Sequence, residues 1–245
     1  MLNVSAKTDI GKKRAINQDT VFALAEPVGP LPNLFIVADG MGGHNGGEIA
    51  SQVAIAHFCK HIESHGSILK SGVLDLLTSA ANAANAEVFS QSKIHSDLTG
   101  MGTTLTACTI DNGKCSIIHV GDSRAYAVTG DGITQLTSDH SYVNEMVKAG
   151  QMSPAEAREH PKRNVLTQVL GPNAEMSADG YIVDVEPGSV ILLCSDGLYN
   201  MVSEEEIKHL INTSQKPAIA LVDAANAQGG TDNITVVVVK IEVTP

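Results

Sequence analysis

Residues 229–239 read Gly-Gly-Thr-Asp-Asn-Ile-Thr-Val-Val-Val-Val, a turn followed directly by an apolar run. The β-branched residues predict a strand from Ile234 to Ile241, with Asp232 just before its first residue. Two other apolar runs end in aspartate, LFIVAD at Asp39 and ILLCSD at Asp196, and Asp122 follows the run IIHVG. Each of these predicted strands therefore brings one carboxylate to one of its ends.

Other segments rich in Val, Ile, Leu and Thr also predict strands. Asn112-Gly113 and Gly130-Asp131-Gly132 supply residues that tolerate positive φ, so they predict hairpins and hence antiparallel sheets. The predicted strands besides 234–241 are 20–24, 34–38, 103–110, 114–120, 124–128 and 189–194.

Helices are predicted between and after these strands. Ser153, Pro154 and Glu156 form a helix-start pattern, and Ser203 with Glu206 repeats its cap. The order of elements predicts an α+β fold, a central antiparallel β-sandwich with helices on both sides in four layers, and one domain over residues 1–245. The predicted helical segments are 47–65, 73–93, 141–149, a start at 153–156, 207–211 and 216–227.

Charge and composition exclude several classes of partner. The formal net charge is −11, with 16 Lys and Arg against 27 Asp and Glu, which disfavours nucleic acid and anionic membranes. No apolar run approaches the roughly 20 residues of a membrane helix, and the start lacks a signal-peptide pattern, so we expect a cytoplasmic protein. The four cysteines stand singly in apolar runs, which predicts buried free thiols.

Aspartates beside apolar strands are costly unless they are solvated, hydrogen-bonded or bound to a cation. Antiparallel strands can bring such ends to one rim of a sandwich, where an all-oxygen cluster suits Mg²⁺ or Mn²⁺ better than Zn²⁺. Gly40 and Gly197 follow two of the aspartates and allow close backbone approach. Two metals about 4 Å apart can hold a water in line with phosphorus, which predicts hydrolysis without a protein nucleophile. For Asp122 a simple turn-capping role is the alternative.

Two other patterns are weaker. The glycine-rich stretch 39–47 lacks the Lys and Ser/Thr of a P-loop and fails the dinucleotide fingerprint. His57, His61 and His65 share one helix face, but without an acidic helper they predict a surface stripe rather than a zinc site.

Six strings in order resemble one known family. These motifs resemble those of the metal-dependent protein phosphatases of type 2C, in their bacterial serine/threonine phosphatase branch, and they span nearly the whole chain. They are GKKRAINQD (11–19), VADGMGGHNGGE (37–48), GMGTTL (100–105), HVGDSRAY (119–126), LLCSDGLYN (192–200) and GGTDNITVVVV (229–239).

The resemblance implies an α+β sandwich with two or three Mn²⁺ or Mg²⁺ ions. It implies that Asp39 bridges two metals, that Asp196 and Asp232 complete one site, and that the Gly40 carbonyl contributes to the other. It further implies that Asp122, together with Asp196, binds a third ion.

The resemblance also assigns the residues around the metals. Asp19 would hold metal-bound water, and Asn233 would orient the ligand beside it. Arg14 would grip the substrate phosphate, which its planar guanidinium suits better than a lysine.

Two positions depart from the family pattern. Gln18 stands where many relatives have glutamate, which removes a negative charge near the Gly40 carbonyl. Met41 stands where eukaryotic relatives have a histidine proposed as general acid. We therefore expect the leaving alkoxide to be protonated by a metal-bound water, which the spacing favours, or by His44.

Residues 139–171 resemble the flap beside the bacterial active site, with His140, Ser141, His160 and Arg163 as its polar and basic residues. The flap would steer phosphoproteins or gate access. The alternative is a solvated helical pair without a catalytic role.

The resemblance predicts hydrolysis of phosphoserine and phosphothreonine in proteins by a metal-bridging water, opposing a serine/threonine kinase. We expect a monomer in bacterial signalling, with kinase substrates and the kinase itself as partners. The alternatives are a catalytically silent phosphoprotein-binding module on the same fold and a phosphatase of small phosphate esters.

Overall fold

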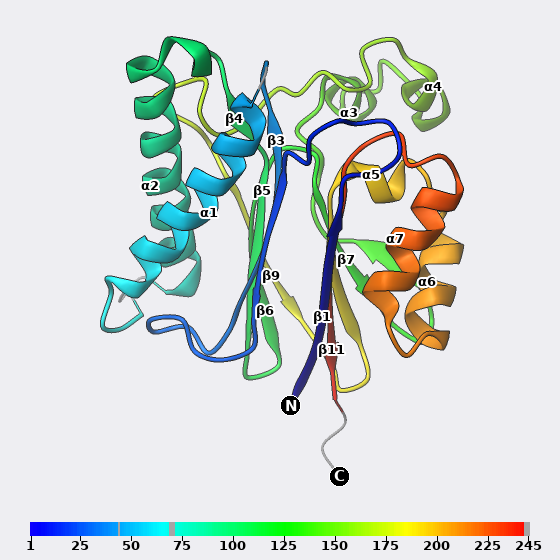
Figure 1. Cartoon of the computed structure of the whole chain (residues 1–245). Helices are drawn as coiled ribbons and strands as arrows, with labels where there is room; N and C mark the ends of the chain where they lie inside the picture. Colours follow the sequence, from blue (N-terminus) through cyan, green and yellow to red (C-terminus); the bar gives the residue numbers. More distant parts are fainter. Residues whose placement is uncertain (44, 69–71, 243–245) are drawn as a thin grey trace.

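Two antiparallel sheets pack face to face, with helices on both outer sides (Figure 1). The structure is a computed structural model and describes residues 1–43, 45–68 and 72–242. Both chain ends lie at the lower end of the molecule in this view. The predicted four-layer α+β sandwich is confirmed.

The first sheet has the strand order β2-β3-β5-β6-β9, and β4 pairs with β3. All its strand pairs are antiparallel. Its strands are β2 (Asp19–Leu24), β3 (Leu34–Met41), β4 (Gly102–Thr103), β5 (Leu105–Asp111), β6 (Lys114–Val120) and β9 (Asp179–Asp184).

The second sheet has the order β1-β11-β10-β7-β8, also antiparallel throughout. The C-terminal strand β11 lies between the N-terminal strand and β10, so the two ends of the described chain are joined in one sheet. Its strands are β1 (Leu2–Asp9), β7 (Arg124–Val128), β8 (Ile133–Gln135), β10 (Val190–Cys194) and β11 (Ile234–Ile241).

Helices cover both outer faces. In Figure 1, α1 (Gly46–Glu63) and α2 (Val73–Ile94) lie on the first sheet, and the short 3-10 helix Ser96–Leu98 follows α2. On the second sheet lie α5 (Asp196–Tyr199), α6 (Glu204–Thr213) and α7 (Pro217–Ala227). The remaining helices, α3 (Tyr142–Lys148) and α4 (Pro154–Glu159), lie at the upper end of the sandwich, above the second sheet.

Serine caps fix the starts of three of these helices. Ser153 and Glu156 form the predicted capping box at α4, in which each side chain bonds to the backbone of the other. Ser141 and Ser203 accept a backbone N–H at the starts of α3 and α6. Each cap satisfies an N–H that the helix itself leaves unpaired.

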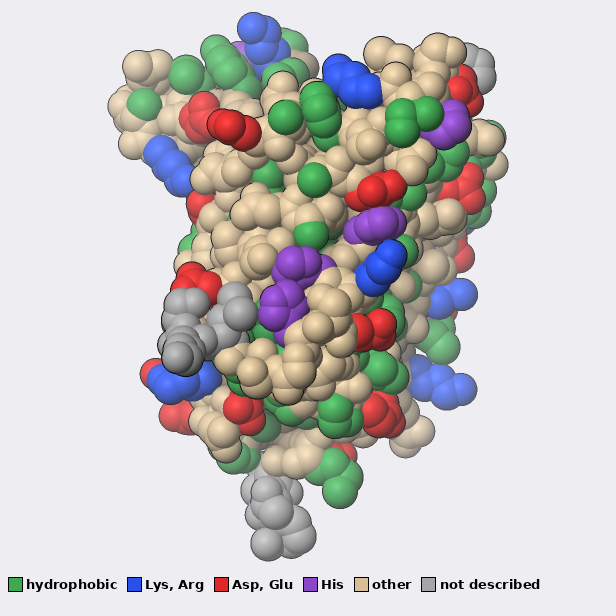
Figure 2. Space-filling model, turned by 90° about the vertical axis from the view of Figure 1, so that its left-hand side faces the viewer, with side chains coloured by type: hydrophobic (Ala, Val, Ile, Leu, Met, Phe, Trp, Pro, Cys, Tyr) green, Lys and Arg blue, Asp and Glu red, His purple; other side chains and the backbone are tan. Residues whose placement is uncertain are grey.

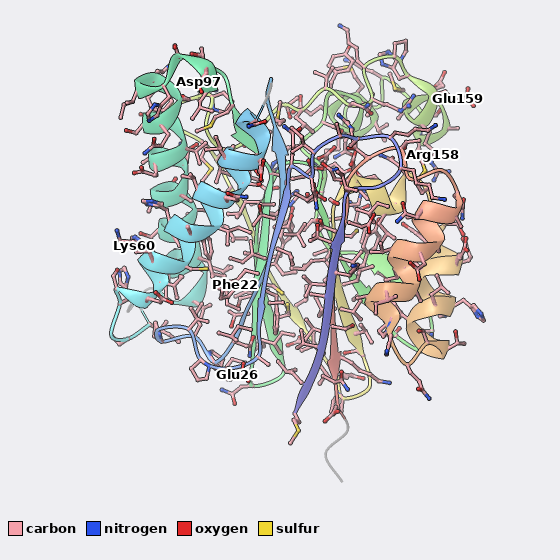
Figure 3. All side chains as sticks on the ribbon, viewed as in Figure 1. Phe22, Glu26, Lys60, Asp97, Arg158 and Glu159 are labelled. Carbon is pink, nitrogen blue, oxygen red and sulfur yellow. The ribbon has the colours of Figure 1, made fainter. Side chains whose placement is uncertain are left out.

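Three apolar layers hold the four layers of structure together. Phe58 and Leu77 belong to the layer between the first sheet and α1 and α2, and Phe22, labelled in Figure 3, packs against it. Phe35 and Val237 belong to the layer between the two sheets. The third layer joins the second sheet to α5, α6 and α7. With 3% aromatic residues, Val, Ile, Leu and Ala fill most of this volume.

Most predicted elements are present, with five differences. The predicted strand 103–110 is divided at Thr104, and β1, β8, β9 and α5 were not predicted. Strands β8 and β9 lie at sheet edges and alternate half-buried with exposed side chains, so their apolar signal is weak.

The cysteines, the histidines and the apolar runs noted in the sequence can be followed in the structure. All four cysteines are free and buried, as predicted. Histidine side chains gather on the helical face shown in Figure 2. His61, on α1, contacts the ring of His65, and His61 Nε2 lies 2.9 Å from Ser79 Oγ. Within the described ranges, none of the helices combines the length and apolar character needed to cross a bilayer.

Candidate active site

Five aspartates reach the same end of the sandwich because of the strand directions. Antiparallel neighbours alternate direction, so the start of one strand lies beside the end of the next. Asp19 begins β2 and Asp39 lies near the end of β3. Asp122 follows β6, Asp196 follows β10, and Asp232 precedes β11. We call this end of the sandwich, with these five residues, the acidic rim.

Strand register places two of the carboxylates side by side. Asp19 and Asp39 are direct partners in the β2–β3 pair. Like charges directly opposite each other destabilise a sheet. Burial, followed by repulsion from Asp19, Asp196, Asp122 and Asp232, raises the pKa of Asp39 well above its usual value. The other four carboxylates therefore lie close enough to act on Asp39.

The neighbouring carboxyls are perturbed in the same direction. Burial raises the pKa of Asp19 and that of Asp122 to about 6, and burial with repulsion from Asp122 raises the pKa of Asp196. In the described part of the chain, Asp19 Oδ1 and Asp196 Oδ1 are buried without a hydrogen-bond partner. Clustered, desolvated and partly unpaired carboxylates fit a hard divalent cation, since its charge would offset both the burial and the repulsion.

The geometry of the rim also limits how ions can bind. Among the residues that the structure describes, no three Asp, Glu, His or Cys side chains form a ready-made ligand group for one ion. The β2–β3 register nevertheless places Asp19 opposite Asp39, and repulsion from the other rim carboxylates contributes to the raised pKa of Asp39. Magnesium commonly keeps several waters and uses one or two carboxylates, so dispersed oxygen ligands suit it.

Two threonines hold Asp39, and sequence reasoning gave them no role. Thr104 Oγ1 accepts the Asp39 N–H at 2.9 Å, and the Thr104 N–H donates to the Asp39 carbonyl at 2.8 Å. Thr103 Oγ1 donates to that same carbonyl at 3.0 Å. Both threonines belong to the motif 100–105 and are buried, so their hydroxyls need hydrogen-bond partners. Two polar side chains in a predicted buried strand were the sequence signal for such a role.

Two further side chains support the rim from the second sheet. Ser195 Oγ donates to Asp19 Oδ2 at 2.7 Å, which links the two sheets. Tyr199 donates its hydroxyl to the Asp122 carbonyl at 3.1 Å, and the Arg124 guanidinium lies 3.6 Å from the centre of the Tyr199 ring. The predicted carboxylates are therefore fixed through their backbones as well as their side chains.

Arg14 contacts Asp232 at the acidic rim. Its Nη2 lies 2.6 Å from Asp232 Oδ2, and this hydrogen bond raises the pKa of Arg14. The Arg14 side chain is 52% exposed, so part of the guanidinium faces solvent. Arg14 thus stands at the open side of the acidic rim.

The backbone at Gly40 is tightly enclosed. A Cβ on Gly40 would overlap the carbonyl oxygen of Gly47, at the start of α1. A Cβ on Gly47 would lie 2.7 Å from Gln18 Nε2. Gln18, the departure noted in the sequence, therefore lies against the Gly40–Gly47 contact.

The residues of the flap segment divide into two groups. His140 and Ser141 are buried, and Ser141 caps α3. His140 donates its N–H to the Gly121 carbonyl at 2.7 Å, and its Nδ1 accepts the Gly121 N–H at 3.2 Å, next to Asp122. Arg163 is exposed, and His160, which follows Glu159 (labelled in Figure 3) at the end of α4, is half-buried.

The motif 37–48 contains Met41, which replaces the histidine of eukaryotic relatives, and His44, the alternative to a metal-bound water as proton donor. Met41 is 40% exposed at the end of β3 and has no proton to donate. His44 lies outside the described residues. Protonation of the leaving alkoxide by a metal-bound water, with His44 as the alternative, stays a prediction.

Replacing Gly197 with alanine should distort the acidic rim. A Cβ at Gly197 would overlap the Asn233 carbonyl oxygen, which is backbone and cannot move aside cheaply. We expect Gly197→Ala to cost about 1–3 kcal/mol or more of unfolding free energy, measured by thermal melting. Gly132→Ala is the control, because nothing lies within 4 Å of its Cβ position. Equal melting temperatures for the two variants would contradict the packing described here.

Clustered carboxylates suited to divalent cations, with an exposed arginine beside them, are typical of metal-dependent phosphatases, and comparisons with known proteins show the family. The family described as protein phosphatase 2C matches residues 11–228. Protein phosphatase PhpP of Streptococcus pneumoniae is 39% identical, and the alignment covers 98% of each chain.

Solved structures agree with this match. The serine/threonine phosphatase of S. agalactiae superposes with a TM-score of 0.91 at 36% identity, covering 99% of this chain and 100% of that one. The catalytic domain of the serine threonine protein phosphatase PstP, in complex with two manganese ions, gives a TM-score of 0.85 at 33% identity and 99% coverage of both chains. The chain belongs to the protein phosphatase 2C family.

Proposed function

We propose that this chain is a metal-dependent phosphatase that hydrolyses phosphoserine and phosphothreonine in proteins. The gathering of five aspartates at one rim carries this proposal, because their repulsion needs bound cations. Family membership and the serine/threonine phosphatases among the relatives support the same activity rather than a silent binding module.

The acidic rim would hold two or three ions of Mg²⁺ or Mn²⁺. Asp39, Asp196 and Asp232 would be direct ligands, with the Gly40 carbonyl and Asp122 completing the outer sites. When bound, the ions would supply charge neutralisation and an activated water for attack on phosphorus. Asp19 would accept hydrogen bonds from ordered water, since its Oδ1 is buried without a protein partner among the described residues.

Arg14 would bind the phosphate of the substrate. A guanidinium can form two parallel hydrogen bonds to phosphate oxygens, and more than half of the Arg14 side chain is accessible. Its ion pair with Asp232 orients it toward the rim before substrate arrives. Water rather than a side chain would attack phosphorus in this arrangement, so the side chains would act by positioning and by electrostatics.

We further propose that residues 139–171 form a flap on the single catalytic domain 1–245. The segment lies at the acidic end of the sandwich, and His140 ties its base to the backbone beside Asp122 (Figure 1). Its exposed basic residues would contact phosphoproteins made by a serine/threonine kinase, the kinase included. The monomeric state, the cytoplasmic location and the exclusion of nucleic acid stay predictions.

An assay of phosphopeptide hydrolysis tests the proposed function. We expect turnover of a phosphothreonine peptide with Mn²⁺ or Mg²⁺, and none after a chelator removes the metal. Small phosphomonoesters should be hydrolysed with a lower kcat/KM than the peptide. A phosphatase of small esters would show the opposite order, and a silent module would show no turnover with any metal.

Replacing Arg14 with alanine should chiefly weaken substrate binding. A charge-assisted hydrogen bond contributes about 1.5–3 kcal/mol, so KM for the phosphopeptide should rise about tenfold or more, with a smaller change in kcat. Steady-state kinetics at saturating Mn²⁺ measure this effect. The control is Lys13→Ala, the exposed neighbour in the same loop, and an unchanged KM for Arg14→Ala would refute the phosphate role.

A further inference from the structure

Asn233 makes three side-chain hydrogen bonds to one loop. Its Nδ2 donates to the carbonyls of Ile10 at 2.9 Å and Ile16 at 3.0 Å. Its Oδ1 accepts the N–H of Gln18 at 2.9 Å. Asn233 is 4% exposed, so its amide is buried, whereas Ile10 and Ile16 are exposed. One amide therefore closes residues 10–18, the loop that carries Arg14.

The backbone of Asn233 acts on the other member of the Arg14 ion pair. Its N–H donates to Asp232 Oδ1 at 2.9 Å, while Arg14 binds Asp232 Oδ2 at 2.6 Å. Both carboxylate oxygens of Asp232 are thus oriented. Asn233 therefore binds Asp232 through its backbone N–H and binds the loop that carries Arg14 through its side chain.

A second set of contacts closes the base of the same loop. The Lys12 N–H donates to the Gly230 carbonyl at 2.7 Å, and Asp9 Oδ1 accepts the N–H of Gly11 at 2.9 Å. Gly11 has φ +76°, and a Cβ there would overlap the Asp232 carbonyl oxygen. The loop backbone therefore lies directly on the segment 230–233. Asn233 supplies the hydrogen bonds described on either side of these contacts, to the carbonyls of Ile10 and Ile16.

We propose that Asn233 is a positioning residue for Arg14 and thereby sets the affinity of the enzyme for phosphate. This inference rests on the proposed phosphate role of Arg14. The exposed residues 12–16 carry no buried side chain that could anchor them. Fixing the loop from both ends limits the positions of the guanidinium, and a pre-organised group loses less entropy when it binds its ligand.

Asparagine suits this position because both of its amide hydrogens and its oxygen are used. Aspartate would keep the acceptor for Gln18 N–H but would turn a carboxylate oxygen toward two carbonyls. Alanine would remove all three bonds and leave the carbonyls of Ile10 and Ile16 without this donor.

The test compares Asn233→Ala with Asn33→Ala, a matched control. Asn33 is also 4% exposed and also bridges backbone groups, since its amide bonds to the N–H and carbonyl of Ile110. It precedes β3, about 20 Å along that strand from Asp39. Both variants lose buried backbone bonds, but only one of these losses touches the Arg14 loop.

We expect Asn233→Ala to raise both the KM for a phosphothreonine peptide and the inhibition constant of inorganic phosphate by about three- to tenfold. The change in kcat should be smaller, and Asn33→Ala should leave both constants unchanged. In an Arg14→Ala background, Asn233→Ala should raise neither constant further, because the two changes remove one interaction. Should Asn233→Ala fail to fold, Asn233→Asp serves as the second variant.

Limited trypsin digestion gives a readout that does not depend on activity. Lys12, Lys13 and Arg14 are consecutive cleavage sites in the loop. Well below both melting transitions, cleavage there should be several-fold faster in Asn233→Ala than in Asn33→Ala. Equal cleavage rates together with an unchanged KM would overturn the inference. If Arg14→Ala itself left KM unchanged, the phosphate role of Arg14 would be refuted, whereas the trypsin rates would still decide whether Asn233 holds the loop.

Discussion

Asp39→Asn should lower metal-dependent hydrolysis of a phosphopeptide by on the order of a thousandfold or more. Asp39 lies opposite Asp19 in the β2–β3 pair and is repelled by four other carboxylates. Asparagine keeps the shape of the side chain but removes the charge that the proposed bridging position requires. The rate at saturating Mn²⁺ measures the effect.

The same substitution should stabilise the metal-free protein. At pH 8, removing one of several neighbouring negative charges should raise the free energy of unfolding by about 1–2 kcal/mol. That gain appears as a melting temperature higher by a few degrees. Addition of Mn²⁺ should then raise the melting temperature of Asp39→Asn much less than that of the unmodified protein.

Asp111→Asn is the matched control for Asp39→Asn. Asp111 is exposed at the far end of β5 in the same sheet, where it turns into β6. Asp111→Asn should leave the rate of phosphopeptide hydrolysis, the melting temperature and its increase on Mn²⁺ addition unchanged. Full activity in Asp39→Asn would contradict the proposed metal site.

Asp139→Asn should destabilise the fold by about 3–5 kcal/mol. Asp139 accepts three hydrogen bonds from Arg124, at 2.9 and 3.1 Å from Nε and 2.7 Å from Nη2, and both side chains are largely buried. Loss of the carboxylate charge would leave the guanidinium buried and unpaired. For a chain of this size the change corresponds to about 10 °C in melting temperature, measured by calorimetry.

An exposed ion pair provides the control for Asp139→Asn. Lys114 and Asp184 lie 2.9 Å apart, with side chains 61% and 85% exposed. Asp184→Asn should cost less than about 1 kcal/mol, because water already solvates both charges. Similar losses for the two variants would show that burial does not set the strength of the Arg124–Asp139 pair.

The strongly apolar strands and the long helices could be predicted from the sequence because their signals are local. Val236 to Val239 are buried on both faces of β11, and α2 lacks breakers over 22 residues. Strands β8 and β9 could not be found, since an edge strand with exposed side chains resembles a loop. Helix α5 is one turn long, which is too short for a periodic pattern.

The acidic rim was partly predictable. An aspartate at the end of a buried strand is costly, so the sequence alone indicated Asp39, Asp122, Asp196 and Asp232. The pairing of Asp19 with Asp39, and the contact of Ser195 with Asp19, depend on register between distant segments. From the sequence, Asn233 was expected to orient its neighbour Asp232. Its side chain instead binds the loop 10–18, including Gln18, which lies 215 residues away in the sequence.

Anomalous diffraction from crystals grown with Mn²⁺ tests the central claim most directly. The account predicts at least two manganese peaks at the acidic rim, with Asp39 between them and Asp196 and Asp232 beside one of them. Active enzyme whose manganese peaks lie away from these carboxylates would contradict it.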